Sequence, residues 1–98
     1  MGKGTPHCKL AVVKAMVSAG QVRTTKSARE GAVALGFDFD GMLAVIQALT
    51  TTDFHKSMTT HAGHRVWQDV YRPTTPAGEV YLKLIVIDDV LIVSFKEL

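Results

Sequence analysis

Two alternating apolar runs decide the fold of this chain: YLKLIVI at residues 81–87 and VLIVSFK at residues 90–96. Only Asp88-Asp89 separates them, and acidic residues are common in turns. β-Branched and other apolar residues dominate both runs, as is typical of strands. With a two-residue turn at Asp88-Asp89, the pairing sets Tyr81 opposite Lys96. The stretch therefore predicts one antiparallel hairpin with a defined register.

Side chains on a strand alternate between two faces, so this register gives the hairpin an apolar face and a polar face. The apolar face, expected against a core, holds Leu82, Leu84, Val86, Leu91, Val93 and Phe95. The opposite face holds Tyr81, Lys83, Ser94 and Lys96. A phenol and two ammonium groups thus share one face, which is either an ordinary solvated surface or a place for chemistry.

The composition is that of one globular domain, expected to span residues 1–98. Ninety-eight residues can bury a single core, and the chain is 47% hydrophobic and 20% charged. No apolar run is long enough to cross a bilayer, and the first residues lack the apolar region of a secretory signal. Cys8 is the only cysteine, which excludes an internal disulfide and fits a reducing compartment. We therefore expect a cytoplasmic protein without a membrane partner.

Helix start and stop signals precede the hairpin. They outline three helices, from Thr5-Pro6 to Gly20, from a capping box at Ser27–Glu30 to Gly36, and from a cap at Asp40 onward. Residues 21–24 are short enough for a brief strand, and residues 58–60 and 66–72 are further strand candidates. Helices followed by antiparallel strands predict an α+β domain, with the helices gathered against one side of the sheet.

The strand before the hairpin carries two further polar side chains. If residues 73–78 form a six-residue connector, Gln68 and Arg72 lie on the same face as Tyr81. A loop one residue longer or shorter presents Trp67, Asp69 and Tyr71 there instead, and the pattern alone leaves both registers open. Lys56 can join this surface from the preceding strand.

The polar face has the residue types needed to act on a phosphodiester. Its candidates are Lys56, Gln68, Arg72, Tyr81, Lys83 and Lys96. Cations suit phosphate, and an amide or a phenol can orient a ribose hydroxyl. A phenol acts as a base only where neighbouring cations stabilise the phenolate. This chemistry needs no metal.

Three histidines, His55, His61 and His64, raise the possibility of a zinc site. The His-x-x-His spacing suits a helix, whereas the surrounding residues favour strand, and no cysteine or nearby carboxylate completes a tetrahedral set. We expect no metal and no cofactor.

Several blocks along the chain resemble one family. They are QVRTT (21–25), FDGM (39–42), DF (53–54), KSMTT (56–60), WQDVYRP (67–73), VYLK (80–83) and DVLIVSFKE (89–97). These blocks resemble the MqsR toxins (motility quorum-sensing regulator), and the match covers nearly the whole chain. The resemblance implies a RelE-like α+β fold, in which three N-terminal helices pack on an antiparallel sheet formed by the C-terminal half. It implies a single toxin domain over residues 1–98.

The resemblance also implies an activity and a site. Such toxins are mRNA interferases of type II toxin–antitoxin systems, which cleave single-stranded mRNA at GCU-type sites without the ribosome. The family's proposed active residues match here as Lys56, Gln68, Tyr81 and Lys96. By analogy with RelE-like ribonucleases, the ribose 2′-hydroxyl attacks the adjacent phosphate and leaves a cyclic phosphate.

Roles for these residues follow as a hypothesis from that analogy. Tyr81 orients or deprotonates the 2′-hydroxyl, Lys56 and Lys96 stabilise the phosphorane charge, and Gln68 positions the phosphate or ribose. Arg72 and Lys83 are expected to bind the RNA backbone.

The resemblance further implies partners. Besides the mRNA substrate, it implies a cognate MqsA-type antitoxin, a zinc-containing DNA-binding protein. Zinc would then belong to the antitoxin, and DNA association would occur only through the complex.

Two other functions compete with RNA cleavage. The chain could bind RNA without cutting it, or it could bind a partner protein. Residues 1–30 carry six lysine or arginine residues against Glu30 alone, which suits an acidic partner. A pure binder would protect RNA, whereas an enzyme would cleave it.

Overall fold

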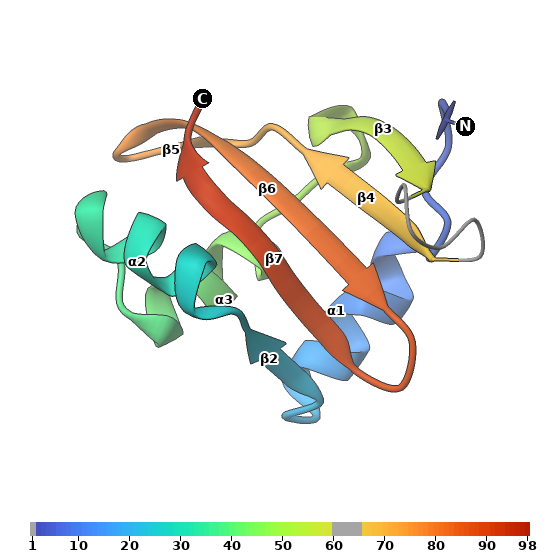
Figure 1. Cartoon of the computed structure of the whole chain (residues 1–98), viewed down its shortest axis with the longest axis horizontal. Helices are drawn as coiled ribbons and strands as arrows, with labels where there is room; N and C mark the ends of the chain where they lie inside the picture. The colour runs from blue at the N-terminus through green and yellow to red at the C-terminus, as the bar shows by residue number, and fades with distance from the viewer. Residues whose placement is uncertain (1, 60–65) are drawn as a thin grey trace.

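The computed structural model describes residues 2–59 and 66–98 of the chain (Figure 1). In chain order the elements are β1 (Gly2–Lys3), α1 (Leu10–Ser18), β2 (Val22–Thr24), α2 (Lys26–Ala34), α3 (Phe39–Gln47), the 3-10 helix η1 (Thr51–Asp53), β3 (Phe54–Thr59), β4 (Trp67–Tyr71), β5 (Thr74–Thr75), β6 (Gly78–Val86) and β7 (Val90–Glu97). The α+β prediction is therefore confirmed, with helices first and most of the strands after them.

One sheet contains most of these strands. Its order is β1-β3-β4-β6-β7-β2, and β5 pairs with β6 beside it. The pairs are antiparallel except β2–β7, which is parallel. The brief strand expected at residues 21–24 is thus confirmed as β2, at an edge of the sheet. The C-terminal half forms the centre of the sheet, and N-terminal segments form both edges.

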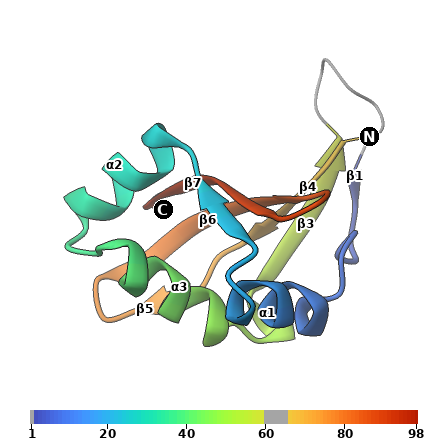
Figure 2. The ribbon, with the colours of Figure 1, turned by 90° about the horizontal axis from the view of Figure 1, so that it is seen from below.

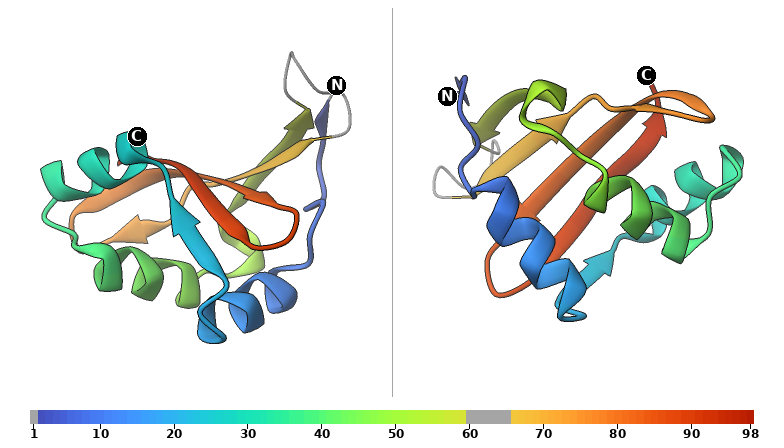
Figure 3. Two further views of the ribbon diagram at one scale, coloured as in Figure 1. Left: turned by 60° about the horizontal axis from the view of Figure 1, so that its bottom comes forward. Right: turned by 180° about the vertical axis from the view of Figure 1, so that it is seen from behind.

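Helices α1 and α3 lie on one side of the sheet, whereas α2 lies at its edge beside β7 (Figure 2). The right-hand view of Figure 3, from behind the molecule, shows α1 and α3 in front of the sheet, and Figure 2 shows the same layers from below. Between the layers lies the core, made by Val13, Val17, Ala28, Ala32, Met42, Val45, Ile46, Leu49, Tyr71, Val80, Leu82, Leu84, Val90, Ile92 and Phe95. No helix of the described chain covers the side of β3, β4, β6 and β7 that faces the viewer in Figure 1. We call this side the outer face.

The helices begin at other residues than the sequence predicted. The side chain of Thr25, not Ser27, caps α2 by accepting a hydrogen bond from the Ala28 N–H. Asp38, not Asp40, caps α3 by accepting one from the Gly41 N–H at 2.7 Å. In each case another residue with a capping side chain lies two positions earlier, so composition alone could not choose between them.

The first helix begins at Leu10, so the predicted start at Thr5-Pro6 is wrong. The reason is a long-range contact: the carboxylate of Asp69 in β4 accepts hydrogen bonds from the backbone N–H groups of His7 and Cys8, at 3.0 and 3.1 Å. Those donors are held at the sheet and stay outside the helix. The stops predicted at Gly20 and Gly36 are confirmed, and both glycines have a positive φ, of 79° and 88°.

The hairpin register differs from the prediction near its turn. Val86 pairs with Val90, so the loop has three residues instead of two. A two-residue primed turn needs positive φ angles, and no non-glycine residue of the described chain has one. A bulge between Lys83 and Leu84 takes up the extra residue, so Tyr81 still pairs with Lys96. The pairing that matters for the site is therefore confirmed.

The bulge changes which side chains of β7 enter the core. Val90 and Ile92 are fully buried, whereas Leu91 and Val93, predicted in the core, are half-buried. On β6 the prediction for Leu82 and Leu84 is confirmed. An insertion of one residue inverts the faces on one side of the bulge, because strand side chains alternate with a period of two.

The connector before β6 is shorter than the predicted six residues. Thr75 pairs with Gly78, which leaves only Pro76-Ala77 as the turn. Proline at the second position and glycine at the fourth suit a type I turn, and Gly78 has a φ of 101°. Val70 consequently pairs with Lys83 and not with Tyr81. A shift of two residues preserves the faces, so Gln68 lies on the predicted side.

Candidate functional site

The outer face carries its polar side chains in three rows that run across the strands. The first row joins Tyr81 of β6 to Lys96 of β7, which are paired directly. Continuing the β4–β6 register by one residue places Arg72 opposite Tyr81, and the Thr74–Glu79 pair has the same register. Arg72 is exposed, and its N–H donates to the Asp53 carbonyl at 2.7 Å. The first row thus consists of Arg72, Tyr81 and Lys96.

Two ammonium groups flank the phenol of this row. Lys96 Nζ lies 5.4 Å from the centre of the Tyr81 ring, and Lys83 Nζ lies 5.9 Å from it. Both distances are within the range of cation–π contacts. Tyr81 and Lys83 are half-buried, while Lys96 is exposed. A negative charge that develops beside the phenol would therefore have two cations near it.

The second row consists of Lys56, Val70, Lys83 and Ser94, which are paired in that order across β3, β4, β6 and β7. Val70 is fully buried, although no helix of the described chain covers this face. Long lysine stems can cover an apolar neighbour while the charged end stays in solvent. Two strand spacings separate Lys56 from Lys83, about 10 Å between Cα atoms. The row therefore offers two cations, of which Lys83 is the nearer to Tyr81.

The third row consists of Met58, Gln68, Ile85 and Leu91. All four are half-buried, and Gln68 is the only polar member. Arg23 of β2 pairs with Leu91 at the end of this row, and its guanidinium forms an ion pair with Asp89. The row is therefore mostly apolar, in contrast to the two cationic rows.

All six residues predicted for the site lie on the outer face, but they do not form one cluster. Tyr81, Lys83 and Lys96 lie together, and Lys56 is two strands away from Lys83. Gln68 is two rows from Tyr81, which corresponds to about 14 Å between Cα atoms. Sequence reasoning did not place Met58 and Ile85 on this face, and it wrongly placed Leu91 on the core face. Met58 and Ile85 follow Lys56 and Lys83 by two residues, so strict alternation was a usable signal for them.

Close packing of α2 holds the end of β7 that carries Lys96. A Cβ atom on Gly31 of α2 would lie 2.1 Å from the Phe95 carbonyl oxygen and 3.5 Å from Lys96 Cβ. Only glycine permits this approach, because a contact under 3 Å requires the backbone to move. The packing of α2 therefore fixes the position of β7 where it carries Lys96.

The other sequence candidates do not join this site. His61 and His64 lie outside the described residues, and His55 is exposed at the start of β3. Among residues 2–59 and 66–98, no group of three histidine, cysteine or acidic residues could hold a metal ion. Burial and the nearby Asp69 carboxylate raise the pKa of the Cys8 thiol, which disfavours a reactive thiolate. None of the helices among these residues combines the length and the apolarity that a membrane crossing requires.

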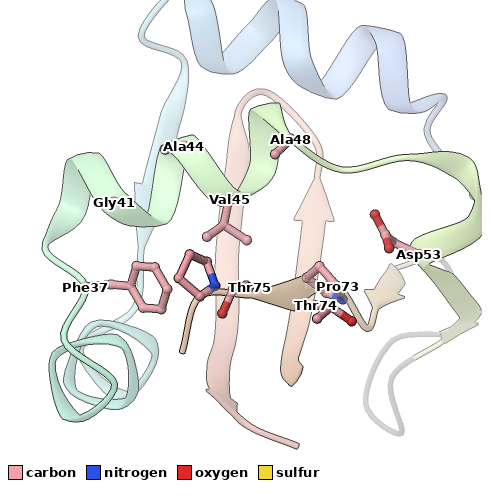
Figure 4. Close-up of a pocket in the computed structure, with 10 residues that line it drawn as sticks. Phe37, Gly41, Ala44, Val45, Ala48, Asp53, Pro73, Thr74 and Thr75 are labelled. Carbon is pink, nitrogen blue, oxygen red and sulfur yellow. The ribbon is translucent and has the colours of Figure 1, made fainter. Parts of the chain in front are cut away.

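A pocket of about 280 Å³ lies elsewhere, between α3 and the Pro73–Pro76 segment. Figure 4 shows Phe37 at one end of it and Asp53 at the other. Its lining is mostly apolar and includes no lysine or arginine and no residue of the three rows. The pocket is therefore separate from the cationic surface.

Comparison with known proteins gives two matches. The family described as "Motility quorum-sensing regulator, toxin of MqsA" matches residues 5–97. The mRNA interferase toxin MqsR of Escherichia coli (strain K12) is 62% identical over 97 residues, which cover 99% of both chains. Both matches span the three helices and all strands from β2 to β7.

Proposed function

Because the chain belongs to the MqsR toxin family, we propose that it is an mRNA interferase, the endoribonuclease toxin of a type II toxin–antitoxin system. The observation that carries this proposal is the Tyr81 phenol on the outer face, with the ammonium groups of Lys83 and Lys96 at 5.9 and 5.4 Å from its ring centre. A phosphodiester needs cations for its developing charge and a group that orients the attacking hydroxyl. We propose single-stranded mRNA as the substrate, cleaved at GCU-like sites without the ribosome.

The proposed step is an attack by the ribose 2′-hydroxyl on the adjacent phosphorus. As the bond from the 2′-oxygen to phosphorus forms, Tyr81 either accepts the hydroxyl proton as a phenolate or orients the hydroxyl while its proton passes to water. Lys96 and Lys83, the cations nearest the phenol, stabilise the charge of the phosphorane. The bond from phosphorus to the 5′-oxygen then breaks, and that oxygen takes a proton from one of the two ammonium groups. The products are a 2′,3′-cyclic phosphate and a 5′-hydroxyl.

We propose that the remaining cations bind the RNA backbone. Lys56 is exposed and lies two strands from Lys83, about 10 Å between Cα atoms, so it can meet a phosphate beside the reacting one. We therefore give Lys56 and Arg72 the role of holding neighbouring phosphates of the strand. No step of this scheme requires a metal or another cofactor.

The proposed protein partner is an antitoxin of the MqsA type, since the family's description names MqsA. In this proposal the antitoxin carries the zinc and the DNA-binding activity, and the toxin reaches DNA only through the complex. Both would act in the cytoplasm.

The test is cleavage of a defined single-stranded RNA that contains one GCU, in EDTA and without ribosomes. The parent should give discrete fragments with cyclic-phosphate ends. Tyr81→Phe and Lys96→Ala should each lower the rate about 100-fold or more, the range seen when one stabilising donor is removed from an active site. Lys26→Ala removes an exposed lysine from the start of α2 and is the charge-matched control, with a rate close to the parent's.

Two outcomes would contradict the proposal. Intact RNA after incubation with folded parent protein, together with protection of the RNA from other nucleases, would indicate a binding protein. Full cleavage by both variants would remove the first row from the mechanism and leave the nuclease activity to another surface.

A further inference from the structure

The third row differs in chemistry from the two rows beside it. The first two rows hold four cations and a phenol, which suit the RNA backbone. The third holds three apolar side chains around one amide. On this contrast, which rests on the proposed function, we propose that Gln68 reads the edge of a base next to the cleaved bond. It would then set sequence preference and would not act on the reacting atoms.

The amide of Gln68 is available for such a contact. Within residues 2–59 and 66–98 its side chain makes no hydrogen bond, although it is half-buried. A glutamine amide offers two donors and one acceptor in a plane, which can pair with two atoms of a base edge. A partly desolvated amide without a protein partner gains more from such a pair than one in open solvent does.

The neighbours of Gln68 suit a base and not a phosphate. Met58 and Ile85 are its direct partners on β3 and β6, and Leu91 lies beyond Ile85. Apolar side chains can pack against the flat face of a base, and the methionine sulfur contacts aromatic rings favourably. Arg23, which pairs with Leu91 at the end of the row, forms an ion pair with Asp89. A phosphate placed here would find no unpaired cation in the row.

The separation from Tyr81 argues against direct catalysis by Gln68. Side chains of a strand stand roughly perpendicular to the sheet, so the distance of about 14 Å between Cα atoms persists toward their outer ends. The lysines of the second row lie between the two residues. RNA held by that row would present a phosphate to Lys83 and a neighbouring base to Gln68.

The experiment measures kcat/KM for the parent's preferred RNA and for RNAs with each single-base change around the cleaved bond. Gln68→Met keeps the length of the side chain and removes its hydrogen-bonding groups, and Gln68→Glu keeps its shape and removes its donors. We expect both variants to reduce discrimination at one position about ten-fold or more, the size expected for one bidentate base contact. Gln21→Met, at an exposed glutamine before β2 and outside the three rows, is the matched control and should leave the preference unchanged.

Two other outcomes would overturn the role proposed for Gln68, and a third would overturn the proposed function itself. A uniform loss over all sequences, like that expected of Tyr81→Phe, would assign Gln68 to the reacting atoms and overturn the proposal. An unchanged rate and preference in both variants would also overturn it. Absence of cleavage by the parent would instead be a failure of the proposed function, since it precedes any effect of Gln68.

Discussion

The two faces of the central sheet belong to the same strands, yet the inner face packs into the core and the outer face carries the candidate site. Along β6, Val80, Leu82 and Leu84 are buried against the helices, while Tyr81 and Lys83 between them are only half-buried on the outer face. Alternation of this kind separates the residues that stabilise the fold from those free to carry chemistry. We therefore expect substitutions on the inner face to change stability and substitutions on the outer face to change RNA cleavage.

Each face contains exceptions to this division. Asp69 and Ser57 are buried polar residues on the inner face, and Val70 is a fully buried apolar residue on the outer one. The Asp69 carboxylate is explained by its hydrogen bonds from the His7 and Cys8 N–H groups, which attach the segment before α1 to the sheet. Hydrogen bonds to a charged acceptor contribute more than neutral ones, so this contact is a substantial part of the N-terminal packing.

The largest expected effect is a difference in the free energy of unfolding between variants of two neighbouring residues of β6. Leu82→Ala should lower the free energy of unfolding by about 2–5 kcal/mol, because it removes a fully buried side chain from the core. Lys83→Ala should leave that free energy almost unchanged, slow RNA cleavage, and weaken RNA binding with a shallower dependence of affinity on salt. Urea unfolding and RNA binding at several salt concentrations measure both quantities.

These two variants test whether the inner face alone stabilises the fold. If Lys83→Ala destabilised the protein as much as Leu82→Ala does, the lysine stem would be part of a second core around Val70. Lys96→Ala is the matched control, since Lys96 is exposed and its alanine variant should not alter unfolding.

A smaller effect is expected at the contact between α2 and β7, the strand that carries Lys96. Gly31→Ala should destabilise the protein by about 1–3 kcal/mol, because the new methyl group would overlap the Phe95 carbonyl and force α2 away from β7. It should also slow RNA cleavage, since the same strand carries Lys96. Thermal unfolding and cleavage rates would be measured together.

Ser27→Ala in the same helix is the control for helix propensity. Alanine is the better helix former, and replacing glycine within a helix normally gains about 1 kcal/mol. A Gly31→Ala variant with a raised midpoint would therefore show that the contact with β7 is loose and that α2 does not fix Lys96.

The sequence predicted the features that depend on local pattern. The pattern of residues 81–96 placed Tyr81 opposite Lys96 and assigned the faces of β6. Both glycine stops were also correct. Because faces follow parity, an error of two residues in the connector left Gln68 on the predicted side.

The sequence could not supply what depends on distant contacts or on turn geometry. The start of α1 is set by Asp69, more than 60 residues away, and no local signal in residues 5–10 reports it. The bulge that buries Ile92 instead of Val93 follows from the three-residue turn. The separation of Gln68 from Tyr81 required the register of β4 against β6, which the pattern left open.

The smallest effect concerns a third polar group buried on the inner face, the hydroxyl of Tyr71. Burial, and then the charges of Asp69 and Cys8, raise the pKa of Tyr71 to about 12. A free tyrosine ionises near pH 10, so between pH 10 and 12 the unfolded chain loses a proton that the native protein retains. The contribution of this group to stability is therefore intact at pH 9 and below, and it falls by about 1 kcal/mol as the pH rises from 9 to 11.

Tyr71→Phe should remove this loss and give a flatter dependence of unfolding free energy on pH above 9. At pH 7 it should not destabilise, because the buried hydroxyl has no hydrogen-bond partner in the described chain and the ring contact with Phe54 can persist. Ser57→Ala is the matched control: it removes the other buried hydroxyl without a partner, and a serine does not titrate in this range. Equal alkaline slopes in parent and Tyr71→Phe would mean that this phenol ionises in the native protein as it does in solvent. Water would then reach Tyr71, and the contrast between an inner face that excludes solvent and an outer face exposed to it would not hold at this residue.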